Sequence, residues 1–136
     1  MYAVSRTLVL GVAGIFEALI GVVLIVVPGV VSELLLGSAE ISPEALVFGR
    51  MMGAALLCIG VASWLSRSDS RSAVQRAQLV GLAIYYSLGA IVLAYAGVAL
   101  NLAGVLLWPA VLVHVLLAAW CLVCLREPGA LSGHAG

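Results

Sequence analysis

Four long apolar runs, separated by short polar or turn-forming segments, set the hydrophobic pattern of this chain. The runs cover residues 8–27, 44–65, 76–96 and 103–125. Each is close to the roughly 20 residues that an α-helix needs to cross the hydrocarbon core of a bilayer. The pattern therefore predicts an all-α fold, an integral membrane four-helix bundle that forms a single transmembrane domain.

The segments between the runs carry signals for the ends of helices. Pro28 stops the first run, and Ser42, followed by a proline and a glutamate, provides a capping side chain for the second. Residues 30–37 are too short to span, and their apolar residues surround a Ser-Glu pair. We expect a short interfacial helix in this first connection, and a flexible tail over residues 126–136.

The arginines are distributed unevenly between the connections, and this predicts an orientation. The amino terminus, the connection between the second and third runs and the carboxyl end together carry Arg6, Arg67, Arg71, Arg76 and Arg126. The other two connections carry none. The positive-inside rule then places both termini in the cytoplasm.

Composition supports a membrane protein and excludes several functions. Of the 136 residues, 65% are hydrophobic and only 9% are charged, against about 25% charged residues in typical globular chains. The formal net charge is zero, so nothing favours a nucleic-acid partner. The sequence lacks a phosphate-binding loop, a HExxH motif and a nucleophile elbow. We therefore lean away from an enzyme and expect no metal site.

Five polar residues are predicted to form one site near the middle of the bilayer. Glu17 is the only charged residue of the first run, and intramembrane charges are costly and usually paired. At about 1.5 Å per helical residue, Glu17 lies roughly 15 Å from the outer end of its helix, level with Tyr85, Tyr86 and His114. Arg50 lies roughly 8 Å deep, and its long side chain can reach one turn toward Glu17.

Small residues repeat along single faces of the predicted helices. They include Gly14, Gly21, Gly53, Gly60 and Gly89. Small residues let membrane helices approach closely, so we expect these glycines to pack one helix against another. Because Glu17 borders the glycine face of the first helix, it is expected to point into the bundle.

The polar set is compatible with three functions. Arginine, histidine and tyrosine can donate hydrogen bonds to a quinone headgroup or a lipid hydroxyl, and glutamate or histidine can exchange protons with it. A proton-coupled small-cation or drug transporter would instead use an unpaired Glu17. A cluster that only fixes the geometry of the bundle would make the protein a structural assembly partner. We favour binding of a lipophilic ligand.

Haem and thiol chemistry are not expected. His114 is the only histidine within the apolar runs, so a haem held by two histidines would need a second chain. Cys121 and Cys124 have the CxxC spacing, but reactive thiols need an accessible, electropositive setting. The apolar surroundings favour a packing role for both.

A few positions resemble the DoxX-like group of small bacterial four-helix membrane proteins. The first helix has a glycine-rich second half that ends at a proline (residues 21–28), and the second carries Arg-x-x-Gly at Arg50 and a later glycine at Gly60. The resemblance implies the bacterial cytoplasmic membrane and a role facing quinone or lipid, in some members as an accessory subunit of a redox complex. Expected partners are membrane lipids and a second copy or another membrane subunit.

The chain also resembles small multidrug-resistance transporters, which have four helices and a glutamate in the first. Glu17 fits that position. The arginine bias and Arg50 depart from the pattern of those transporters, so we rank this resemblance second.

Overall fold

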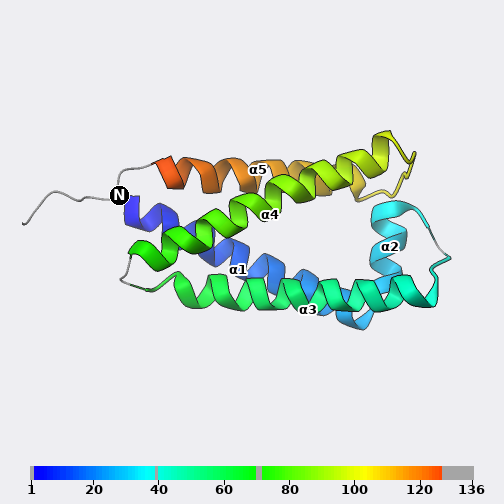
Figure 1. Cartoon of the computed structure of the whole chain (residues 1–136), viewed down its shortest axis with the longest axis horizontal. Coiled ribbons are helices and arrows are strands. Elements are labelled where there is room, and N and C mark those ends of the chain that lie inside the picture. The colour runs from blue at the N-terminus through cyan, green and yellow to red at the C-terminus, as the bar shows by residue number, and fades with distance from the viewer. Residues whose placement is uncertain (1, 39, 70–71, 127–136) are drawn as a thin grey trace, which may run out of the picture.

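The computed structural model describes residues 2–38, 40–69 and 72–126, and within them the chain folds into five helices (Figure 1). In chain order these are α1 (Tyr2–Val26), α2 (Pro28–Leu36), α3 (Pro43–Ser66), α4 (Ser72–Val98) and α5 (Leu107–Arg126). All except α2 are long and apolar enough to cross a membrane. The protein is therefore all-helical, with the four candidate spans that the apolar runs predict.

The helices begin at residues that differ from the predicted bounds: α1 begins at Tyr2 rather than at residue 8, and α4 at Ser72 rather than at residue 76. α5 begins at Leu107 rather than at residue 103. The preceding loop is held outside the helix because the Leu106 amide donates to the Leu34 carbonyl of α2 (2.8 Å). The flexible tail predicted for residues 126–136 lies outside the described residues, apart from Arg126, which ends α5.

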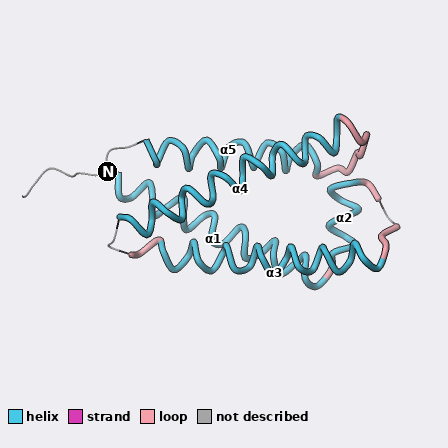
Figure 2. The backbone as a smooth tube through the Cα atoms, in the orientation of Figure 1, coloured by secondary structure: helices cyan, strands magenta, loops and turns pink. Residues whose placement is uncertain are grey.

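The long helices form two tightly packed pairs, α1 with α3 and α4 with α5, with few contacts between the pairs (Figure 2). The backbones of α1 and α3 approach closely. A Cβ added at Gly21 would lie 2.7 Å from the Gly53 carbonyl oxygen, and one at Gly60 would lie 2.8 Å from that of Gly14. These four glycines thus lie where a larger side chain would separate α1 from α3.

The two pairs meet around a buried core in one half of the bundle. Its members come from the first half of α1, the first half of α4 and the second half of α5: Val9, Leu10, Ala13, Leu79, Leu82, Ala83, Tyr86, Leu117, Ala118, Cys121 and Cys124. This half ends where Arg6, Ser66 and Arg126 lie, which we call the terminal end.

Polar groups join the helices at the terminal end. Ser63 of α3 is completely buried and accepts a hydrogen bond from Gln78 of α4 (2.9 Å). The Arg67 carbonyl accepts hydrogen bonds from Thr7 (3.2 Å) and Gln75 (3.0 Å). Together these bonds tie α1, α3 and α4 at this end.

The opposite end, which we call the α2 end, is built differently. The helix pairs separate there, and α2 runs across the gap between them (Figure 1). Gly37, which has φ +72°, caps the carboxyl end of α2, and this end contacts Gly104 in the loop before α5. A Cβ at Gly104 would collide with the backbone of Leu34 and Leu35, so only glycine allows this loop to dock on α2.

Candidate functional site

Glu17 is the buried acid around which the candidate site forms. Its side chain is 1% exposed, and its carboxyl group faces the hydroxyl groups of Tyr85 and Tyr86 on α4. Neither Glu17 Oε1 nor the completely buried Tyr86 hydroxyl has a partner with full hydrogen-bond geometry in the described part of the chain. Glu17 and Tyr86 are thus close to each other, but each can still form a further hydrogen bond.

His114 of α5 completes the cluster. Its Nδ1 lies 2.8 Å from the Ala110 carbonyl oxygen, and a carbonyl only accepts, so Nδ1 carries a proton. The second nitrogen, Nε2, is then an acceptor when the ring is neutral. The ring centroid lies 5.7 Å from that of Tyr86 and 5.9 Å from that of Tyr85.

Gly89 makes room for the imidazole. A Cβ at this position would lie 2.6 Å from His114 Cδ2 and 3.0 Å from its Nε2. Gly89 is one helical turn beyond Tyr85 on α4, so the same stretch of helix supplies a tyrosine ring and a gap for the histidine. The sequence predicted close helix packing at Gly89, and here the neighbour is a side chain rather than a backbone.

Arg50 does not join the cluster. It is exposed on α3 and makes no ion pair with Glu17. The contact between α1 and α3 runs through Gly53 and Gly60, and Gly49 lies against Pro28 of α2; Arg50 follows Gly49 and points away from these contacts. Glu17 meanwhile faces the other helix pair. The predicted set of five residues is therefore a set of four in the structure: Glu17, Tyr85, Tyr86 and His114.

The cluster offers a carboxyl group, two phenols and an imidazole within one region of the bundle, enough for hydrogen bonding and proton exchange. No group of three or more potential metal ligands occurs within residues 2–38, 40–69 and 72–126. Cys121 and Cys124 are buried and pack in the same core as Tyr86. Both side chains are surrounded by the apolar residues of this core.

Two features of the structure were not predicted from the sequence. One is the hydrogen bond between Ser63 and Gln78, which is signalled only by two polar residues inside apolar runs. The other is a cleft of about 640 Å³ at the α2 end, for which the sequence pattern has no signal because residues from four separate segments form it.

Comparison with protein-family models, with curated proteins and with solved structures finds no match to this chain.

Proposed function

We propose that this protein binds a lipophilic molecule, quinone-like or lipid, through the cluster of Glu17, Tyr85, Tyr86 and His114. The observation that carries the proposal is that Glu17 Oε1 and the Tyr86 hydroxyl, although they face each other, are buried without a partner of full hydrogen-bond geometry among the described residues. Leaving such a group unsatisfied costs about 1–3 kcal/mol. Intramembrane ionisable residues commonly mark ligand or proton pathways, and a ligand that hydrogen-bonds to both groups would remove this cost.

The chemistry of the cluster suits a headgroup with oxygen acceptors in an apolar ring. The Tyr86 hydroxyl donates to a carbonyl oxygen, while Glu17 and the Nε2 atom of His114 exchange protons with the reduced or oxidised headgroup. A lipid hydroxyl would use the same partners. The protein would then be an accessory subunit that holds the ligand, with other chains performing electron transfer.

In this proposal the bundle lies in the bacterial cytoplasmic membrane with the terminal end toward the cytoplasm. The arginines of the sequence lie mostly at that end, which is the orientation that the positive-inside rule favours. α2 would then lie at the outer interface, as an amphipathic connection between spans.

A second candidate function is proton-coupled transport of a small cation. A transporter of this kind needs a carboxylate for which a proton and the substrate compete. The sequence argued against it because Arg50 was expected to pair with Glu17. Since Arg50 is exposed on α3 and makes no ion pair with Glu17, that objection no longer holds.

The first experiment identifies lipophiles that copurify with the protein, by mass spectrometry of extracts from purified wild type and variants. Losing a hydrogen bond of about 1 kcal/mol lowers affinity roughly fivefold, so Glu17→Gln and Tyr86→Phe should each lower occupancy by about that factor. Tyr95→Phe is the matched control because Tyr95 is exposed on the same helix. Finding only bulk lipid in the wild type would contradict the binding proposal.

A second measurement separates the transporter from the binding protein. Proton-coupled uptake of a cationic dye into vesicles should be abolished by Glu17→Gln if the protein transports. If no ligand and no uptake are found, the cluster serves only to assemble the bundle.

A further inference from the structure

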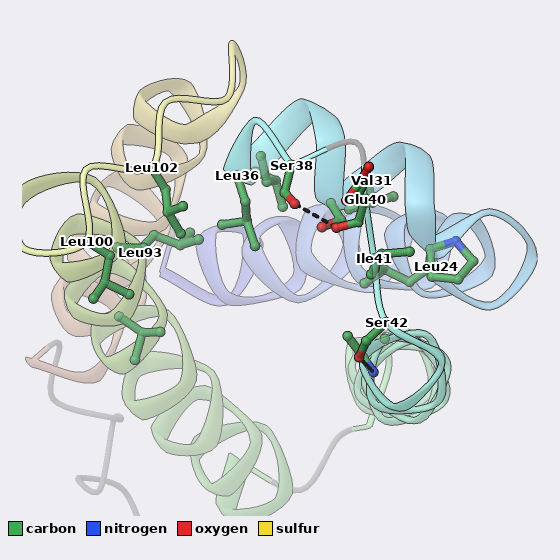
Figure 3. A pocket seen from close by; sticks show the side chains of 17 residues that line it. Leu24, Val31, Leu36, Ser38, Glu40, Ile41, Ser42, Leu93, Leu100 and Leu102 are labelled. Carbon is green, nitrogen blue, oxygen red and sulfur yellow. Dashed lines mark hydrogen bonds between the residues drawn. The ribbon is translucent and has the colours of Figure 1, made fainter.

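The cleft at the α2 end lies between the separated helix pairs (Figure 3). Its volume is about 640 Å³, within the range of roughly 300–1,000 Å³ that is usual for small-molecule sites. α1 contributes Leu24, α2 contributes Val31 and Leu36, and α4 contributes Leu93, whose side chains line the space. All but four of the lining residues are apolar, so the body of the cleft suits a hydrocarbon chain or ring.

The four polar lining residues lie on α2 and in the connection from α2 to α3: Ser32, Ser38, Glu40 and Ser42. Two of the serines already have local partners. The Ser38 hydroxyl donates to the Glu40 carbonyl oxygen (2.8 Å), and the Ser42 hydroxyl accepts from the Ala45 amide (3.2 Å). The carboxylate of Glu40 makes no hydrogen bond or ion pair with the described residues, so it is the available charged group at this edge.

The charge around this edge is mainly negative, because three acids face a single basic residue, Arg50, which follows the lining residue Gly49 and is exposed on α3. Residues 27–49 include Glu33, Glu40 and Glu44 and contain no arginine, lysine or histidine, and residues 99–106 contain no charged residue at all. A negative edge beside an apolar cavity attracts a cation and repels an anion. The ligand that complements it has an apolar body and a positively charged head.

We propose that the cleft beneath α2 binds a cationic amphiphile, with its alkyl or ring portion against Leu24, Leu36 and Leu93 and its ammonium head beside Glu40. This site is separate from the Glu17 cluster. Leu24 and Leu93 lie two helical turns, roughly 10 Å, beyond Glu17 and Tyr86 along their helices. The proposal therefore does not rest on the function assigned to the cluster.

The test uses the full chain in phosphatidylcholine vesicles and three photoreactive dodecyl probes that differ only in their heads: an ammonium, an alcohol and a sulfate. Labelled positions are mapped by mass spectrometry. The ammonium probe should label residues 31–42 and 92–102 in preference to the exposed faces of the helices. Equal labelling of the cleft by the sulfate probe, or labelling spread evenly over the exposed faces, would overturn the proposal.

Two variants test the head and the body of the site. An exposed ion pair contributes up to about 1 kcal/mol, so Glu40→Gln should lower labelling by the ammonium probe roughly two- to fivefold and leave the alcohol probe unaffected. Because Glu40 is exposed, this substitution does not disturb packing. No change with Glu40→Gln would refute the assigned head position.

Ala45→Trp fills the cleft from α3 and should abolish labelling there by both probes. Ala55→Trp is the matched control, because Ala55 is exposed on the same helix and does not line the cleft. Glu17→Gln should leave cleft labelling unchanged, which separates this site from the buried cluster. Loss of labelling with Ala55→Trp or Glu17→Gln as large as that with Ala45→Trp would contradict a distinct site.

Discussion

The two ends of this bundle are held in contrasting ways. At the terminal end, side chains such as Ser63, Gln78 and Gln75 bond across helices, and the helix pairs meet over a continuous core. At the α2 end the helix pairs separate. There α2 and the loop before α5 bridge them through the hydrogen bond from the Leu106 amide to the Leu34 carbonyl. An apolar cleft remains between them.

For helices apolar enough to cross a membrane, this difference is expected from the properties of lipid as a solvent. Apolar side chains gain little by leaving lipid for protein, so no hydrophobic force closes the gap at the α2 end. Buried polar groups must find partners, because unsatisfied ones are costly in a medium without water. Polar contacts therefore pull the terminal end together, while the α2 end can keep a cavity that a ligand fills.

The largest expected effect comes from the α1–α3 contact, which supports both ends. A Cβ at Gly60 would lie 2.5 Å from the Ala18 amide nitrogen, so Gly60→Leu should lower the free energy of unfolding by about 3 kcal/mol or more. Unfolding in detergent, followed by circular dichroism, measures it. Gly81→Leu is the control, because nothing lies within 4 Å of a Cβ at that position; equal effects would show that the close approach is unimportant.

A smaller and local effect is expected from Gly104→Ala at the α2 end. The added methyl group collides with the α2 backbone at Leu34 and Leu35, which should cost about 1–3 kcal/mol and release the loop from α2. Hydrogen exchange should become faster in residues 28–36 while the terminal end keeps its protection. Gly29→Ala is the control, because the nearest atom to its added Cβ would be 4.0 Å away. It should change neither the stability nor the hydrogen exchange of residues 28–36. Faster exchange at both ends would mean that the two ends are not independent.

The smallest effect is expected from Ser63→Ala at the terminal end. The variant loses the hydrogen bond from Gln78, and interhelical hydrogen bonds in membranes average about 0.6 kcal/mol. A double-mutant cycle with Gln78→Leu measures the coupling between the two side chains. A coupling energy near zero would show that this hydrogen bond does not hold the terminal end together.

Some features of the site could be predicted because they depend on position along one helix. Counting residues placed Glu17, Tyr85, Tyr86 and His114 at one level, and the structure brings these four side chains together. Arg50 shows the limit of this reasoning. Its depth can be counted, but its direction depends on which face of α3 packs against α1, and several faces of that helix carry small or apolar residues.

The sequence by itself determined the four long helices and the level of the polar residues, because the length of an apolar run and a residue's depth are local properties. Only the tertiary structure decided that α1 pairs with α3, that Arg50 stays outside the cluster and that a cleft opens beneath α2. These depend on which helix faces meet. In an apolar solvent that choice rests on backbone proximity at a few glycines and on a few polar bonds, rather than on the hydrophobic pattern.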